Sequence, residues 1–238
     1  MRFGPSPPRA NARTGDVGCN IRRRRLLIAF TLMPLPLVLR PAGAAPDLDR
    51  MQQLARDRYG EAAAQRVAAW LRVMQDIEDE SVSEQLSRTN IFFNRSIRWV
   101  EDIDNWGEED YWASPLETMG HGAGDCEDYS IAKYMTLKLL GVPNEQMRLI
   151  YVRARIGGRS QAHMVLGFYQ TPDAEPLILD NLIGEIRPAS RRPDLDPVFS
   201  FNSEGLWVGD ATQSRANPTA RLSRWGRVLE RMQREGLR

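Results

Sequence analysis

A single cysteine in an acidic stretch is the first feature that could do chemistry. Residues 124–134 read GDCEDYSIAKY, so Cys126 lies between Asp125 and Glu127. Gly124 permits a tight turn, and the residues after it have helical character, which places the cysteine in the first turn of a helix. Unpaired N–H groups and the positive end of the helix dipole favour a thiolate there, and they can stabilise an oxyanion. The stretch therefore predicts a nucleophilic cysteine.

The partners of such a thiol are quickly found, because the chain has only two histidines. His163 falls near the start of one expected strand and Asp180 in the next, and neighbouring antiparallel strands can bring two side chains together on one face. A carboxylate on one ring nitrogen would orient the imidazole, and the other nitrogen would face the thiol. The order Cys126, His163, Asp180 thus predicts acyl transfer or amide hydrolysis. His121, in the glycine-rich loop GHGAGD, is expected to be a loop residue.

Each of these residues also has an ordinary structural interpretation. A lone buried cysteine is commonly a small core residue, and a histidine in a strand is commonly a hydrogen-bonded structural group. Acids beside a helix start commonly cap the helix or pair with its dipole. The catalytic interpretation is favoured because a cysteine, a histidine and an aspartate occur in order on a helix start and two successive strands.

Helices are expected before the cysteine. Apolar residues at helical spacing predict a helix over 47–79 that is interrupted at Gly60, and a second helix over 83–100 with Ser83 as its cap. Residues 101–125 are acidic and are expected to be mostly loop.

A helix and a sheet are expected after it. The helix covers 127–140 and ends at Gly141. Three strands, which form an antiparallel meander, follow over 148–156, 161–170 and 177–182. A basic amphipathic helix is expected over 221–234. The pattern predicts the α+β class.

The beginning of the chain has the composition of an export signal. Four arginines, Arg22 to Arg25, precede the apolar run LLIAFTLMPLPLVL, which is short for a membrane span, and Ala42-Gly43-Ala44 forms a small-x-small cleavage sequence. We expect a leader over 1–44, cleavage after Ala44, and one domain over 45–238 whose N-terminal part, about 47–100, is helical. The localisation would then be periplasmic.

Removal of that leader changes the charge and the thiol content. Eight arginines and Cys19 leave with it, so the remaining chain is net acidic, which argues against a nucleic-acid partner. It also keeps Cys126 as its single cysteine, and no internal disulfide can form.

Several sequence segments together resemble one known family. GDCEDYSIAKY, HMVL and LDNL occur in this order, with DYWASPLE upstream, LGVP and LIYVRA between them, and RPDLDPVFSFN downstream. Over roughly residues 85–210 the chain resembles the bacterial transglutaminase-like cysteine proteinases, specifically the LapG-type periplasmic proteases. The resemblance implies a papain- or transglutaminase-like core, with the nucleophile helix packed on an antiparallel sheet. It also implies Cys126, His163 and Asp180 as the catalytic residues.

The resemblance further implies a calcium cofactor, with Asp125 and Glu127 as ligands. Calcium takes six to eight oxygen ligands, so other residues must contribute. The acidic segment offers candidates: Asp102, Asp104, Asn105, Glu108, Glu109 and Asp110. A divalent ion would also offset the negative charge that otherwise raises the pKa of the thiol.

The implied function is cleavage of the N-terminal region of a large surface adhesin, which would control biofilm attachment and release. The implied inhibitory partner is the periplasmic domain of an inner-membrane cyclic di-GMP receptor. Three tryptophans, each also suited to a core position, are candidate anchors for it: Trp106, Trp112 and Trp207. The alternatives are a transglutaminase-like acyltransferase, a cell-wall peptidase, or a binding module with a vestigial triad.

Overall fold

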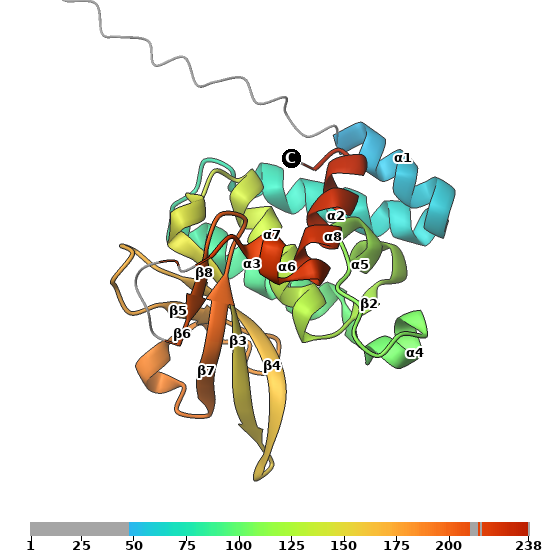
Figure 1. Ribbon diagram of the computed structural model, residues 1–238. Helices are drawn as coiled ribbons and strands as arrows, with labels where there is room; N and C mark the ends of the chain where they lie inside the picture. The colour runs from blue at the N-terminus through green and yellow to red at the C-terminus, as the bar shows by residue number, and fades with distance from the viewer. Residues whose placement is uncertain (1–47, 210–213, 215, 238) are drawn as a thin grey trace, which may run out of the picture. The chain divides into compact units, whose positions relative to one another are not determined.

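The structure is a computed structural model that describes residues 48–209, 214 and 216–237. Helices gather on one side of a six-stranded sheet, and helix α6 lies between the sheet and the other helices (Figure 1). The α+β class expected from the sequence is confirmed. No helix within the described ranges is long and apolar enough to cross a membrane. The predicted leader over 1–44 lies outside the described residues.

The N-terminal helices form where the apolar spacing predicts them. They are α1 (Leu48–Tyr59), α2 (Glu61–Ile77) and α3 (Val82–Ser96). Gly60 separates the first two with a φ of 84°, a conformation that a residue with a Cβ rarely adopts. The cap of α3 is Ser81 and not Ser83, because the Ser81 hydroxyl accepts a hydrogen bond from the Glu84 N–H at 3.3 Å.

The acidic segment is more ordered than its loop-rich sequence suggested. It contains α4 (Asp102–Trp106) and α5 (Pro115–His121). Helix α5 begins with a capping box in which Ser114 and Glu117 each accept the other's N–H, and Pro115 occupies the first helical position. This signal was present in the sequence, and the prediction of loop over 101–125 is wrong at both helices.

A short parallel pair of strands brings the chain to the cysteine. Strand β1 (Arg98–Trp99) pairs with β2 (Ala123–Gly124), and the Val100 N–H donates to the Gly124 carbonyl at 3.1 Å. Because α6 (Cys126–Leu139) starts two residues after β2, this pairing fixes where the helix begins.

The sheet has the order β6-β5-β4-β3-β7-β8, with every pair antiparallel. The predicted meander forms its centre as β3 (Met147–Ile156), β4 (Arg159–Phe168) and β5 (Leu177–Leu179). Strands β1 and β2 were not predicted, and neither were three strands of this sheet: β6 (Arg187–Pro188), β7 (Leu195–Phe201) and β8 (Leu206–Val208). Proline and aspartate obscure the strand pattern in β7, and the β3–β7 register shifts between Tyr151 and Val152, opposite Pro197.

The basic helix predicted over 221–234 forms as α8 (Ser223–Arg234), and a short helix α7 (Pro218–Arg221) precedes it. Trp225 of α8 is fully buried, packs on Tyr134 and Phe201, and donates from its indole N–H to the Asn202 carbonyl at 3.0 Å. Helix α8 therefore covers one end of the core that α6 shares with the sheet.

The two faces of the sheet have separate apolar clusters. The larger cluster joins α6 and the surrounding helices to one face and includes Trp70, Leu149 and Met164. The smaller cluster lies on the other face and consists of Ile150, Val152, Ala154, Val165 and Ile178. A cavity of about 490 Å³ opens beside this smaller cluster.

Candidate active site

Cys126 is the first residue of α6, as the sequence predicted. A Cβ on Gly124 would lie 2.5 Å from the Asp128 carboxylate, so only glycine permits this close approach before the helix. The Cys126 sulfur donates to Glu127 Oε2 at 2.8 Å and also accepts a hydrogen bond from the Met164 N–H. Met164 follows His163 in β4, so the thiol contacts the strand that carries the histidine.

The ionisation of this thiol is not favoured by its surroundings alone. Burial raises the pKa of the Cys126 thiol, and the charges of Glu127 and Asp125 raise it further. The Met164 N–H lowers the pKa, but by less. The helix terminus was expected to favour a thiolate, whereas burial and the adjacent acids Glu127 and Asp125 favour the protonated thiol.

His163 and Asp180 form a buried pair. His163 lies in the middle of β4 and is 2 % exposed, and its Nε2 is 2.8 Å from Asp180 Oδ1. Asp180 was expected within the third strand, but β5 ends at Leu179. Because Asp180 lies just beyond the strand, its carboxylate also accepts a hydrogen bond from the Leu182 N–H at 3.0 Å.

The Asp180 carboxylate is held as an anion. Burial alone would raise its pKa, but hydrogen bonds and charge from His163, the Leu182 N–H and Arg192 together lower the pKa to about 2. Arg192 was not identified from the sequence as a site residue. Its Nη2 is 2.7 Å from Asp180 Oδ2 and 2.8 Å from Asp194 Oδ2.

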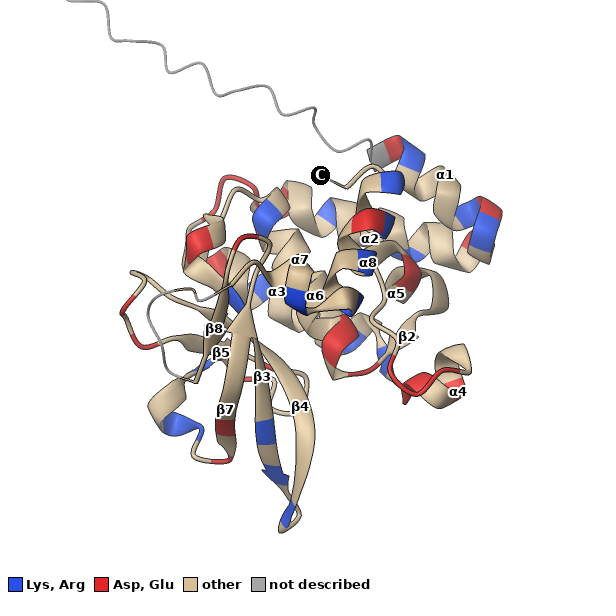
Figure 2. Ribbon diagram, viewed as in Figure 1, with Lys and Arg blue, Asp and Glu red and all other residues tan. Residues whose placement is uncertain are grey.

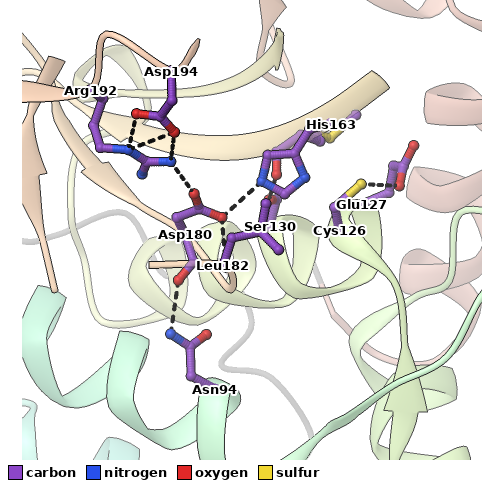
Figure 3. A network of polar contacts seen from close by, with 10 residues as sticks. Asn94, Cys126, Glu127, Ser130, His163, Asp180, Leu182, Arg192 and Asp194 are labelled. Carbon is purple, nitrogen blue, oxygen red and sulfur yellow. Dashed lines mark hydrogen bonds and ion pairs between the residues drawn. The ribbon is translucent and has the colours of Figure 1, made fainter. Parts of the chain in front are cut away.

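The histidine lies between the aspartate and the cysteine. Figure 3 shows the His163 ring with Asp180 on one side and Cys126 on the other. Helix α6 is held against β4 by the Ser130 hydroxyl, which donates to the Met164 carbonyl at 3.0 Å. Because Asp180 occupies Nε2, the nitrogen left for the cysteine is Nδ1. The structure thus brings together the three residues that the sequence singled out.

An acidic cluster lies on the other side of the cysteine. One carboxylate oxygen from each of Asp102, Asp125 and Asp128 lies within 4.8 Å of the other two. Each residue also has one buried oxygen without a hydrogen-bond partner within the described part of the chain: Asp102 Oδ1, Asp125 Oδ1 and Asp128 Oδ2. An unsatisfied buried polar atom costs about 1–3 kcal/mol, so three close together are unfavourable unless protons or a cation offset them.

The pKa values of the three carboxyls are raised, which also indicates that they lack stabilising donors or positive charge. Burial raises the pKa of Asp102 to about 6, although the Tyr111 N–H opposes the shift. Burial and then the charges of neighbouring acids raise the pKa of Asp125, and burial raises that of Asp128. Carboxylate oxygens are the ligands that hard divalent cations take, and the charge and the unpaired oxygens here fit one.

The cluster sharpens the predicted set of metal ligands. Asp125 belongs to it, and Glu127 forms an adjoining group with Asp125 and Cys126. Of the candidate ligands in the acidic segment, Asp102 belongs to the cluster with Asp125 and Asp128. The other acidic candidates are exposed and lie outside both groups: Asp104, Glu108, Glu109 and Asp110. Figure 2 shows this acidic stretch in red at α4 and just after it. Asp128 was not predicted as a ligand, although its place three residues after Asp125 puts both on one helical turn.

The other candidates from the sequence have different surroundings. His121 Nδ1 is 3.1 Å from Asn105 Oδ1, and its ring stacks on Trp106 with centroids 4.0 Å apart. Trp112 is only 6 % exposed and stacks on Phe201, so of the two interpretations that its sequence allowed, core residue or surface anchor, it is a core residue. Trp106 and Trp207 are half-buried.

A helix-borne cysteine beside a strand-borne histidine and an aspartate, on an α+β scaffold, defines the class of papain- and transglutaminase-like thiol hydrolases. The family described as bacterial transglutaminase-like cysteine proteinase matches residues 60–193. The chain belongs to this family and is a cysteine protease. No curated protein matches the chain.

Solved structures of Legionella pneumophila LapG are similar to this protein. An EGTA-treated LapG is 40% identical with a TM-score of 0.70, over 79% of this chain and 100% of LapG. A calcium-bound LapG is 41% identical with a TM-score of 0.67, over 78% of this chain and 98% of LapG. The fold expected from the resemblance is therefore confirmed.

Proposed function

We propose that the protein is a calcium-dependent endopeptidase of the periplasm that cleaves the N-terminal region of a large surface adhesin and thereby controls biofilm attachment and release. The observation that carries the proposal is the first turn of α6. This one turn holds Cys126, which faces the His163–Asp180 pair, together with Asp125 and Asp128 of the acidic cluster.

The proposed reaction uses Cys126 as nucleophile, His163 as acid and base, and Asp180 as the group that orients the histidine. Nδ1 of His163 takes the thiol proton, and the sulfur attacks the scissile carbonyl carbon. N–H groups at the start of α6 stabilise the oxyanion. The imidazolium returns its proton to the leaving amine as the C–N bond breaks, and water then hydrolyses the thioester with His163 as base.

The acidic cluster is the proposed calcium site, with Asp102, Asp125 and Asp128 as ligands and Glu127 beside them. The three unpartnered oxygens and the absence of a basic partner for them among the described residues support this assignment. A bound calcium ion would supply positive charge that lowers the pKa of the Cys126 thiol. The calcium-bound form of the similar LapG also supports it.

Export and regulation complete the proposal. The arginines Arg22 to Arg25, the apolar run after them and Ala42-Gly43-Ala44 support periplasmic localisation. The proposed inhibitory partner is the periplasmic domain of a cyclic di-GMP receptor of the inner membrane. A contact with it requires exposed apolar residues, and Trp99 and Ile103 are 53 % and 51 % exposed.

The experiment is a cleavage assay with residues 45–238 and an N-terminal fragment of the organism's own large surface adhesin. We expect cleavage in calcium, none in EGTA, and none by Cys126→Ala. Asp104→Asn is the matched control, because Asp104 is an exposed acid of the same segment outside the cluster. Cleavage that survives EGTA or Cys126→Ala overturns the proposal. Incorporation of an added amine in preference to hydrolysis assigns the acyltransferase reaction instead.

A further inference from the structure

Arg192 contacts the aspartate of the site from the side opposite to the histidine. Its side chain is 1 % exposed, and its Nη2 bridges Asp180 Oδ2 at 2.7 Å and Asp194 Oδ2 at 2.8 Å. Its Nε also donates to Asp194 Oδ1 at 3.0 Å. The guanidinium plane is therefore held by Asp194 while it donates to Asp180 (Figure 3).

This contact decides how the Asp180 carboxylate is turned. Oδ1 accepts from His163 Nε2 and from the Leu182 N–H, and Oδ2 accepts from Arg192. A carboxylate with fixed donors on both oxygens cannot rotate about its Cβ–Cγ bond without losing at least one of them. The bond to the buried arginine is charge-assisted, and it is the restraint on Oδ2, the oxygen that neither His163 nor the Leu182 N–H contacts.

The other charged groups around Asp180 do not replace Arg192. Lys133 of α6 is fully buried and interacts with Asp180 by charge, but no hydrogen bond joins the two among the described contacts. Asp194 is an acid and disfavours the Asp180 anion. His163 contacts only Oδ1 of Asp180, through Nε2, so it does not restrain Oδ2.

We propose that Arg192 is a positioning residue of the catalytic site, held in place by Asp194, and that it turns the Asp180 carboxylate toward His163. The proposal deepens the proposed function and rests on it for the turnover measurements. It also gives a role to the RPD segment, residues 192–194, which the proposed mechanism leaves unused.

A cavity beside Arg192 makes a direct test possible. The cavity of about 490 Å³ on the far face of the sheet is lined by Arg192 together with Ile178, Ala189 and Leu195. Truncation of Arg192 joins the vacated guanidinium position to this cavity. A guanidinium ion from solution can then occupy the position, whereas urea has the same planar shape without the charge.

The experiment measures kcat and KM for Arg192→Ala on the adhesin fragment, with Arg191→Ala as control because Arg191 is the exposed neighbour. We expect Arg192→Ala to lower kcat by roughly 10- to 100-fold, the usual range for loss of such a supporting contact, with KM within about twofold. Guanidinium below denaturing concentration should restore part of kcat, and urea should not. A kcat within about twofold of wild type, a loss confined to KM, or equal effects of guanidinium and urea would overturn the proposal.

A second measurement does not depend on the substrate or on the alanine variant folding. The chain has only two histidines, so nitrogen-15 histidine labelling gives two ring systems, and His121→Asn assigns them. We expect a protected Nε2–H signal from His163 in wild type, and a shifted, faster-exchanging signal in Arg192→Lys, which cannot bridge Asp180 and Asp194 in the same way. An unchanged signal refutes the positioning role. Failure of wild type to cleave the adhesin, with the expected signals present, refutes the proposed substrate alone.

Discussion

Asp180 lies on one side of the proposed catalytic side chains and a cluster of three aspartates on the other, and the two regions have opposite electrostatic surroundings. Asp180 is surrounded by donors and cations, and its pKa is lowered to about 2. Asp102, Asp125 and Asp128 have unpaired oxygens, and the pKa of each is raised. Burial by itself would raise the pKa of all four carboxyls, so the difference in sign comes from the partners that the chain supplies.

This contrast shows which part of the site has all its partners within the folded chain and which part does not. The contacts of Asp180 with His163 and Arg192 are made by the chain itself, so the histidine is oriented whenever the protein is folded. The cluster beside Cys126 lacks a counter-charge within the described chain. The adjacent acids Glu127 and Asp125 therefore raise the pKa of the thiol. Under the proposed function, the nucleophile becomes reactive only when calcium offsets that charge.

Among substitutions of the aspartates on the two sides of the site, the largest loss of kcat is expected at Asp180. Asp180→Ala removes the orienting group and should lower kcat by roughly 10²- to 10⁴-fold, while KM changes little. Asp180→Asn keeps an oxygen near His163 and should lose less. Steady-state kinetics on the adhesin fragment check both, and a dominant effect of Asp180→Ala on KM would contradict the assignment.

The next largest effect is expected at the cluster. Asp128→Asn removes a proposed ligand and should raise the calcium concentration for half-maximal activity at least tenfold, and excess calcium should restore kcat. Asp104→Asn should behave as wild type, because Asp104 lies outside the cluster. Calcium titration of activity and of thermal unfolding checks this; calcium at 100 times its Kd should add about 2.7 kcal/mol to the unfolding free energy.

The pH dependence of stability should differ between the two regions. Calcium-stripped protein should lose stability as pH rises from about 4 through 6, because the folded pKa of Asp102 lies above its unfolded value. The contribution of Asp180 has the opposite sign: its folded pKa is depressed, so it is lost only as pH falls from about 4 toward 2.

Urea unfolding at several pH values, with and without calcium, measures this dependence. Glu235, whose pKa burial raises to about 7, adds a slope in both conditions, so the difference between the two curves isolates the cluster. Parallel curves with and without calcium between pH 4 and 7 would exclude the cluster as the calcium site.

The smallest effect is expected at the second histidine. His121→Asn should change kcat/KM by less than about twofold, because His121 packs on Trp106 and contacts Asn105, and it makes no described contact with Cys126. Parallel kinetics of His163→Asn, which should abolish turnover, complete the comparison. A large loss at His121 would reverse the assignment of the base.

Much of the fold could be predicted from periodicity and turn residues. Helices α1, α2 and α6 and strands β3 and β4 begin and end within a few residues of their predicted bounds. Strand β7 could not be predicted because Asp196 and Pro197 interrupt its pattern, and pairing with β3 is what holds it extended. Helix α5 is marked in the sequence by its capping box, Ser114 and Glu117, with Pro115 after the cap.

Some residues of the candidate site could be predicted from the sequence and others could not. Cys126, His163 and Asp180 were found from their residue types and order. Arg192 and Asp128 were not, because an arginine and an acid are common anywhere in a chain, and only their contacts distinguish them.

The sequence by itself determined the proposed nucleophile, its position at a helix start and its two proposed partners, because these depend on residue type and on local spacing. The tertiary structure alone decided which acids share one point in space and which cation faces Asp180. Those relations join residues far apart in the chain, and burial, which sets the sign of each pKa shift, exists only after the helices and the sheet have packed.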